Sequence, residues 1–229
     1  MTSNPVYCAL DTSDAEAAAA LAARLRGAVG GIKLGLEFFA ANGPEGVRRA
    51  AGPLPVFLDL KLHDIPNTVS GAVRAIGRLG IAMTTIHAAG GAEMMRAARN
   101  AADETAARPL LLGVTVLTSL DEAALPGIGM AGPVAEAVKR LAALAQESGL
   151  DGAVCSPHEV AALRNQCGAG FILVVPGIRP AGSGDDDQRR TMTPAEALAA
   201  GADILVIGRP ITGAPDPAAA ARSIAATLR

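Results

Sequence analysis

Short apolar segments alternate along the chain with longer segments that are rich in Ala, Leu, Glu and Arg and have helical character. Eight of the short segments are rich in Val, Ile and Leu and are predicted to be strands: Val6–Leu10, Gly31–Gly35, Val56–Leu60, Met83–His87, Leu110–Val116, Gly152–Cys155, Ile172–Val175 and Ile204–Ile207. Their apolar residues run almost without interruption instead of alternating with polar ones. Such strands are typical of a parallel sheet whose two faces are both covered.

The segments between the predicted strands carry signals for the start of a helix. Four starts are predicted in this way: Asp11–Asp14 before Ala15–Leu25, Pro66 before Thr68–Leu79, Thr193-Pro194 before Ala195–Ala200, and Asp216-Pro217 before the final helix. Eight βα units within 229 residues favour a (β/α)₈ TIM barrel over an open sheet. No Pro/Ser-rich linker divides the sequence, so residues 1–229 are predicted to form a single domain.

The composition narrows the classes of partner. The formal net charge is −2, which gives no basic field for nucleic acid or for an anionic membrane surface. The longest conspicuous apolar stretch, Pro109–Leu120, is shorter than the roughly 20 residues of a membrane-spanning helix. The first residues lack a secretory signal, and the three cysteines include no CxxC pair. We therefore expect a cytoplasmic protein that binds neither nucleic acid nor membrane and has no disulfide framework or zinc site.

Two connections between predicted elements are unusually long for βα units. They run from Leu117 to Pro133 and from Pro176 to Thr193. Most βα loops are short, so a long polar loop is a candidate lid over a binding site. The second connection contains the acidic segment Asp185–Asp187, and its composition alone favours an ordinary surface loop instead. Both interpretations of this loop stay open at this point.

Charged residues stand at the end of the third predicted strand, where the sequence reads Phe-Leu-Asp-Leu-Lys-Leu-His-Asp-Ile-Pro-Asn-Thr over residues 57–68. Alternate residues of a strand share a face, so Asp59 and Lys61 are predicted to point the same way. In a barrel, the carboxyl ends of the strands carry the active site. A structural interpretation is equally open: Asp59 and Lys61 form a simple ion pair, and Asp64 caps the helix that begins near Pro66.

A second lysine favours the catalytic interpretation. Lys33 lies in the apolar segment Gly31–Gly35, which is predicted to be the neighbouring strand. Its structural alternative is a lysine at the barrel rim whose ammonium reaches solvent or an acid. Two lysines and two carboxylates at adjacent strand ends form an array of alternating charge. Such surroundings favour the protonated form of a lysine side chain. The resulting ammonium can stabilise a developing carbanion and donate a proton to it.

The segment Asp59–Thr68 closely resembles the signature of the orotidine 5′-phosphate decarboxylase family. The resemblance continues through nearly the whole chain in further segments: Ala9–Asp11, Lys33, Val114–Ser119, Pro176–Pro180 and Ile207–Pro210. Each segment is moderately specific, and together, in this order and spacing, they are very specific. Leu62 departs from the pattern, because many relatives carry an aromatic residue there. Strand parity turns that side chain away from the chemistry, so the departure puts little in doubt.

The resemblance implies a cofactor-free enzyme of pyrimidine biosynthesis that converts orotidine 5′-phosphate to UMP and carbon dioxide. In that family, the equivalent of Lys61 protonates C6 of the pyrimidine, and Asp59 would lie beside the substrate carboxylate. Lys33 and Asp64 would complete the charge array. The family also implies a homodimer with shared active sites. Its partner subunit would supply three residues: Asp64, Ile65 and Thr68.

Further residues would bind the substrate if the resemblance holds. Asp11 and Lys33 would meet the ribose hydroxyls, and Thr118 would lie in the pyrimidine pocket. Loops after the seventh and eighth strands of a barrel often bind phosphate, and here they carry charged residues and glycine. The predicted phosphate-binding residues are Arg179, Gln188, Gly208 and Arg209. An arginine alone at either position is more typical of a solvated surface, but the joint placement favours the phosphate site.

Two rival interpretations differ from this one in a testable way. A Mg²⁺-dependent sugar-phosphate decarboxylase, aldolase or epimerase of the same barrel superfamily would share the Asp-x-Lys-x-x-Asp core. It would resemble neither Ile65–Thr68 nor Gly177–Pro180. A non-catalytic phosphate-binding barrel would not need the pair of Lys33 and Lys61. We expect no metal and no organic cofactor, because no cluster of metal-ligating residues is apparent in the sequence.

Overall fold

The computed structural model describes residues 4–180 and 192–228 and contains a closed barrel of parallel strands, in which each strand pairs with the next and β8 pairs with β1. The strands are β1 (Val6–Ala9), β2 (Gly31–Gly35), β3 (Val56–Leu62), β4 (Met83–His87), β5 (Leu110–Val114), β6 (Gly152–Val154), β7 (Ile172–Val175) and β8 (Ile204–Ile207). All eight predicted strands are confirmed, with β3 extending further than expected and β5 ending earlier. The predicted TIM-barrel fold class is therefore confirmed.

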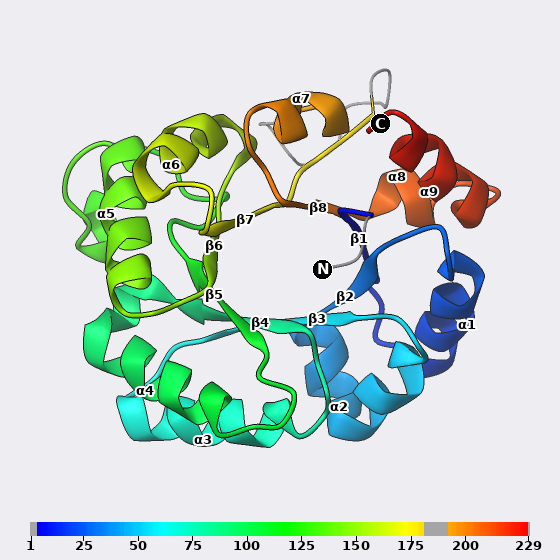
Figure 1. Cartoon of the computed structure of the whole chain (residues 1–229), viewed down its shortest axis with the longest axis horizontal. Helices are drawn as coiled ribbons and strands as arrows, with labels where there is room; N and C mark the ends of the chain where they lie inside the picture. Colours follow the sequence, from blue (N-terminus) through cyan, green and yellow to red (C-terminus); the bar gives the residue numbers. More distant parts are fainter. Residues whose placement is uncertain (1–3, 181–191, 229) are drawn as a thin grey trace.

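Helices surround the ring of strands and follow one another around it in sequence order (Figure 1). The α-helices are α1 (Ala15–Leu25), α2 (Leu36–Ala51), α3 (Pro66–Gly77), α4 (Gly91–Asp103), α5 (Val134–Glu147), α6 (Val160–Cys167), α7 (Pro194–Ala199), α8 (Arg209–Thr212) and α9 (Pro217–Ala226). Short 3₁₀ turns lie at η1 (Ala88–Gly90), η2 (Pro126–Ile128) and η3 (Pro157–Glu159). No helix within the described residues is long and apolar enough to cross a membrane.

The apolar side chains of the strands divide into two layers. One layer fills the barrel interior and includes Tyr7, Phe57, Met83 and Leu112. The other lies between the strands and the helices and contains the alternate strand positions, such as Leu58. Since neighbouring residues of a strand face opposite sides, this division explains why the strands are apolar at nearly every position. It also fixes which strand residues point toward the barrel axis.

Side chains at the helix starts confirm several of the predicted signals. The Asp14 carboxylate accepts hydrogen bonds from the backbone N–H groups of Glu16 and Ala17, and Asp216 does the same at the start of α9. Thr193 and Glu196 form a reciprocal capping box at the start of α7. Such bonds satisfy N–H groups that have no partner inside the helix.

The suggestion that Asp64 caps α3 is wrong. Ile65 occupies the N-cap position of α3, and no side chain there accepts a capping hydrogen bond. Asp64 accepts instead from the N–H of Ile65, the residue next to it, at 2.6 Å. Pro66 at the first turn lacks an N–H, so α3 has one fewer unpaired donor to satisfy there. The carboxylate of Asp64 therefore has no structural task in α3.

The two long connections differ in what the structure describes of them. In the first, both carboxylate oxygens of Glu122 accept from the N–H of Val134, at 3.0 and 3.1 Å, which secures the start of α5. The second, the candidate lid from Pro176 to Thr193, is described up to Pro180 and again from Met192, so residues 181–191 of it lie outside the described residues. Its two ends are held together, because the N–H of Arg179 donates to the carbonyl of Met192 at 3.1 Å.

Candidate active site

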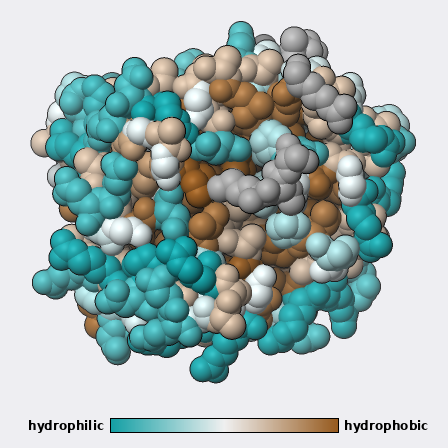
Figure 2. Space-filling model, in the orientation of Figure 1, coloured by the Kyte–Doolittle hydropathy of each residue, from teal (hydrophilic) through white to brown (hydrophobic). Residues whose placement is uncertain are grey.

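A cavity of about 280 Å³ opens where the carboxyl ends of the strands meet. Its walls come from strand ends or following loops at β1, β2, β3, β5, β6, β7 and β8, so residues far apart in sequence converge on it. The space-filling view shows apolar residues toward the middle of the face and hydrophilic ones around them (Figure 2). Position and lining together make this cavity the candidate active site.

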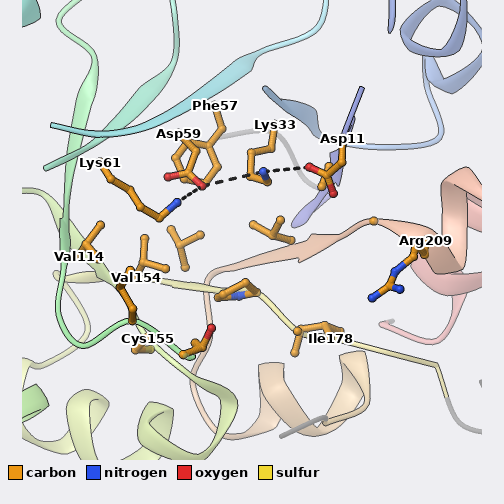
Figure 3. Close-up of a pocket in the computed structure, with 18 of the residues that line it drawn as sticks. Asp11, Lys33, Phe57, Asp59, Lys61, Val114, Val154, Cys155, Ile178 and Arg209 are labelled. Carbon is orange, nitrogen blue, oxygen red and sulfur yellow. Dashed lines mark hydrogen bonds and ion pairs between the residues drawn. The ribbon is translucent and has the colours of Figure 1, made fainter. Parts of the chain in front are cut away.

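Four charged side chains line one side of the cavity, and we call them the charged wall: Asp11, Lys33, Asp59 and Lys61. Lys61 Nζ lies 2.7 Å from Asp59 Oδ2, and Lys33 Nζ lies 3.9 Å from the same oxygen. Lys33 Nζ also lies 3.5 Å from Asp11 Oδ1. The charges alternate along the wall as Lys61, Asp59, Lys33 and Asp11 (Figure 3). Three members of the predicted array, Lys33, Asp59 and Lys61, thus lie together in one chain with Asp11 beside Lys33, whereas Asp64, the second predicted carboxylate, does not line this cavity.

The members of the charged wall differ in how far water reaches them. The side chains of Asp59 and Lys33 are each 14% exposed, whereas those of Lys61 and Asp11 are 39% and 68% exposed. Opposite charges attract more strongly where water is excluded. The attraction between Lys33 and Asp59 is therefore the least screened by water, although at 3.9 Å their contact is the longest of the three in the wall. Lys61 faces the open cavity. Its ammonium pairs with the Asp59 carboxylate, which also pairs with Lys33.

The backbone at Lys61 departs from a regular strand. Lys61 has a φ of +51°, and among the described residues other than glycine only Arg108 also has a positive φ. The pairing of β3 with β4 shifts register between Leu58 and Leu62. A shift of this kind re-aims a side chain and is common beside active sites. Strand parity alone therefore predicts the side of the barrel that Lys61 faces, but not the conformation that directs its ammonium.

The other side of the cavity carries the residues expected to bind phosphate. Arg209, the first residue of α8, and Gly208 before it line the cavity, as does Arg179 after β7. Arg209 lies across the cavity from Lys61 (Figure 3). A Cβ added to Gly208 would approach no atom of the described residues closer than 3.6 Å. A glycine at this position also leaves room for the close approach of a ligand to the backbone.

Apolar residues separate the charged wall from the arginines. Val114, Val154 and Ile178 line this part, together with Val116 and Leu117. Thr118, predicted for the pyrimidine pocket, also lines the cavity. A ligand that fits this lining has a partly apolar body, an anionic group near the arginines and a group that interacts with ammonium at the charged wall.

Three predicted residues lie away from this cavity. Asp64, Ile65 and Thr68 are exposed and do not line it, and the side chain of Ile65 is an exposed large hydrophobic residue at 66%. Gln188, the remaining predicted phosphate ligand, lies outside the described residues. One chain thus brings together Asp11, Lys33, Asp59, Lys61, Thr118, Arg179, Gly208 and Arg209.

Two residues near the site, Thr85 and His87, were given no functional role by the sequence analysis. The Thr85 hydroxyl contacts both Asp59 and the Lys61 backbone. The His87 ring lies 5.2 Å from that of His63, centroid to centroid. Burial lowers the pKa of His87, and the nearby His63 and Lys61 lower it further. Polar residues inside an apolar strand are the signal that could have drawn attention to both, since a buried polar group needs a partner.

The site offers little for metal or thiol chemistry. Within residues 4–180 and 192–228, no group of three or more His, Cys, Asp or Glu side chains could hold a metal ion. Cys155 lines the cavity, but burial raises its pKa well above that of a free thiol. The thiolate is the reactive form of cysteine, so this side chain acts as an apolar part of the lining.

Comparison with known proteins agrees with the geometry. Residues 4–224 match the model of the "Orotidine 5'-phosphate decarboxylase / HUMPS family". The chain is 59% identical to the orotidine 5′-phosphate decarboxylase of Paramagnetospirillum magneticum, over 98% of each chain. It is 57% identical to that of Rhodospirillum rubrum, over 100% of this chain and 95% of the relative. The crystal structure of orotidine 5′-phosphate decarboxylase from Lactobacillus acidophilus is 38% identical and superposes with a TM-score of 0.87 over 99% of each chain.

Proposed function

The chain belongs to the orotidine 5′-phosphate decarboxylase / HUMPS family and decarboxylates orotidine 5′-phosphate to UMP, and we propose that Lys61 is the acid that protonates the product. The family description joins two names, and relatives at 57–59% identity over nearly the whole chain carry the decarboxylase name. The Mg²⁺-dependent sugar-phosphate enzyme and the non-catalytic barrel are therefore not favoured. What remains to be tested is which residue performs which step.

The position of Lys61 Nζ carries the proposal. Lys61 lines the cavity, its Nζ lies 2.7 Å from Asp59 Oδ2, and its side chain is 39% exposed. A purely structural ion pair does not need to face an open cavity. An ammonium in this position can place its charge and its proton against a reacting carbon.

The reaction breaks one bond and forms another at C6 of the pyrimidine. The bond between C6 and the carboxylate carbon breaks, carbon dioxide leaves, and the electron pair stays on C6. The Lys61 ammonium stabilises that pair by its charge and transfers a proton from Nζ to C6, which completes UMP. The neutral amine regains a proton from solvent. Asp59 lies beside the substrate carboxylate in this proposal, and it also holds the Lys61 ammonium in place at 2.7 Å.

The remaining cavity residues bind and orient the substrate in this proposal. Arg209, Arg179 and the backbone at Gly208 bind the 5′-phosphate, and Gln188 joins them from the loop after β7. The guanidinium of Arg209 suits phosphate binding because it can donate two parallel hydrogen bonds to a phosphate. Asp11 and Lys33, 3.5 Å apart, bind the ribose hydroxyls between the two ends of the substrate. Thr118 and the apolar lining hold the pyrimidine ring.

We also propose a homodimer in which each active site is completed by the partner subunit. Asp64, Ile65 and Thr68 are exposed and lie off the cavity of their own chain, although the segment that carries them follows directly on Lys61. A two-fold contact would bury this segment reciprocally and bring the partner's Asp64 to the array. An isoleucine that is 66% exposed next to the exposed carboxylate of Asp64 supports such a contact.

Mixing two inactive variants tests the shared site. Lys61→Ala and Asp64→Ala homodimers should each be nearly inactive. In a hybrid dimer one site collects both defects and the other collects neither. Random exchange makes half of the dimers hybrid, each with one intact site of two, so about a quarter of wild-type activity should return. If mass or tag analysis shows that exchange has occurred and no activity returns, Asp64 acts within its own chain.

We propose further that turnover needs no metal and no organic cofactor, and that the protein works in the cytoplasm. The Lys61 ammonium supplies the charge that a metal would otherwise supply, and the cysteines are free and buried, as in a reducing compartment. The deciding experiment follows the loss of orotidylate absorbance by the purified protein before and after exhaustive chelation. Activity that disappears with chelation and returns with Mg²⁺ would favour the rival Mg²⁺-dependent enzyme.

A further inference from the structure

A single hydroxyl lies behind the charged wall and contacts two of its members. Thr85 on β4 is fully buried, at 0% exposure. Its Oγ1 accepts a hydrogen bond from the backbone N–H of Lys61 at 2.8 Å and donates one to Asp59 Oδ1 at 2.8 Å. No other side chain in the described residues is recorded with hydrogen bonds to both of these residues.

The direction of both bonds is fixed by the chemistry of the groups. A backbone N–H can only donate, so Thr85 Oγ1 must accept from Lys61. The one hydroxyl proton is then left for Asp59, whose carboxylate only accepts. Two hydrogen bonds therefore run from the N–H of Lys61 to the hydroxyl of Thr85 and from that hydroxyl to the carboxylate of Asp59. Donors and acceptors can be assigned in only this way. A hydrogen bond to a charged carboxylate is stronger than one between neutral groups.

The bond to Lys61 occurs where the strand ladder is interrupted. Along β3 and β4 the register passes from Leu58 opposite Thr84 to Leu62 opposite Ile86, so β3 contains extra residues at this point. Lys61, with its φ of +51°, lies inside that irregular stretch. Its N–H is paired with a side chain of β4. The hydroxyl thereby supports a backbone conformation that a lysine rarely adopts.

The bond to Asp59 divides the two carboxylate oxygens between different partners. Oδ1 accepts from Thr85, and Oδ2 is left for the two ammonium groups, at 2.7 Å for Lys61 and 3.9 Å for Lys33. Rotation of the carboxylate away from this orientation would break the bond to Thr85. The hydroxyl therefore orients the acceptor that holds the Lys61 ammonium.

We propose that Thr85 is a positioning residue that sets the place of the Lys61 ammonium through both the backbone of Lys61 and the carboxylate of Asp59. It does not line the cavity, so it acts through these two residues and not on the substrate. The inference rests on the proposed role of Lys61. It identifies a hydroxyl on β4, outside the family signature on β3, as the group that fixes the position of the ammonium.

The test compares three substitutions on one strand. Thr85→Val keeps the shape and removes the hydroxyl, Thr85→Ser keeps the hydroxyl, and Thr84→Val is the matched control. Thr84 is also 0% exposed, but its hydroxyl donates to the carbonyl of Leu58 at 2.8 Å, away from the charged wall. We expect kcat to fall by about 10- to 100-fold in Thr85→Val with KM within about threefold, because misplacing a reacting group by about 1 Å can cost about 100-fold. Thr85→Ser should recover kcat to within about threefold of wild type, and Thr84→Val should stay in that range.

Other outcomes overturn the inference. These are an unchanged kcat in Thr85→Val, a loss carried by KM alone, failure of Thr85→Ser to recover kcat, or an equal fall in Thr84→Val. If Thr85→Val does not fold by circular dichroism, Thr85→Ala takes its place, since it puts no second methyl group beside the Asp59 carboxylate. Wild type and Lys61→Ala are assayed in parallel. An inactive wild type or an active Lys61→Ala would refute the proposed function itself, whereas an active wild type with a fully active Thr85→Val would refute only the role of Thr85.

Discussion

The two ends of the barrel use the same kinds of charged residue for different purposes. At the carboxyl ends of the strands, Lys61 and Lys33 share the Asp59 carboxylate on the wall of a cavity. At the amino ends, Asp151 and Asp203 stand immediately before β6 and β8 and pair with arginines of the outer helices. Both arrangements place charge in partly buried surroundings, so the difference lies in what each charge is directed toward.

The ion pairs at the amino ends of the strands link elements of the fold to one another. Asp151 accepts from the N–H of Leu111 at 2.8 Å and from Arg99 at 2.6 Å, while Asp203 accepts from the N–H of Leu173 at 2.7 Å and pairs with Arg164. Each unit joins a helix to the start of the strand before the aspartate. Arginine keeps its proton and spreads several donors in a plane, which suits a fixed structural link. Lysine can release a proton, which suits the cavity wall. The same charges therefore hold the barrel together at one end and act on a ligand at the other.

Substitution of Lys61 should give the largest effect and should leave stability almost unchanged. We expect Lys61→Ala to lower kcat by more than about 1,000-fold, because it removes both the proton donor and the charge that stabilises the carbanion. Orotidylate turnover, UMP binding and urea unfolding measure the three quantities. Lys139→Ala is the matched control: its side chain is also 39% exposed and pairs with Glu136 at 3.0 Å, but it lies on the outer helix α5. Substantial activity in Lys61→Ala would remove the functional half of the comparison.

Substitution at the opposite end should have the reverse signature. Asp151→Ala leaves Arg99, whose side chain is only 9% exposed, with Asp103 as its remaining recorded ion-pair partner and removes the acceptor for Leu111. We expect the free energy of unfolding to fall by about 3 kcal/mol, with kcat per folded molecule unchanged. Glu45→Ala, which breaks the exposed pair with Arg48, should cost less than about 1 kcal/mol. Equal losses in the two variants, measured by urea unfolding, would show that burial of the amino-end pair has no special weight.

Substitution of Arg209 tests whether an arginine at the carboxyl end of the barrel binds a ligand instead of linking elements of the fold. Arg209→Ala should weaken UMP binding by about 10- to 100-fold, as expected for the loss of charge-assisted hydrogen bonds to phosphate. Uridine, which lacks the phosphate, should bind almost as it does to wild type. Calorimetric titration of both ligands measures the difference, and Arg222→Ala on the surface of α9 is the control. Equal losses for UMP and uridine would mean that the phosphate site has been misplaced.

The fold and most of the cavity follow from local sequence patterns. Parallel strands covered on both faces are apolar at nearly every position, which is why all eight could be recognised. Helix starts were readable at Asp14, Thr193 and Asp216 because capping depends on residues only two or three positions apart. Lys33, Asp59 and Lys61 could be proposed because the ends of parallel strands converge on one side of a barrel, whereas Asp11 was proposed only from the family resemblance.

What could not be predicted depends on contacts between distant segments. Arg99 and Asp151 are 52 residues apart, and no local spacing indicates that they meet. Thr85 lies 26 residues from Asp59, and a threonine in an apolar strand is typical of ordinary β structure. The positive φ of Lys61 carries no sequence signal either, because glycine or asparagine would be expected there. The contacts of Thr85 and the conformation of Lys61 arise from the packing of β3 against β4, whereas the Arg99–Asp151 pair joins α4 to the residue before β6.

The smallest expected effect concerns pH and again separates the two ends of the barrel. The pKa of His87 is lowered from 6.5, first by burial and then by the charges of His63 and Lys61. The folded protein therefore resists protonation of His87, whereas the unfolded chain takes up that proton near 6.5. The contribution of His87 to stability is complete above that value and is lost as the pH falls through 6.5 toward the lower pKa of the folded state. We accordingly expect His87→Gln to lose less stability than wild type between about pH 8 and pH 5.5, as measured by urea unfolding. The difference from wild type should be smaller than the change caused by Asp151→Ala.

His158→Gln, which alters an exposed histidine, is the control and should show the same dependence of stability on pH as wild type. A wild-type slope in His87→Gln would mean that the acid sensitivity of the fold arises elsewhere.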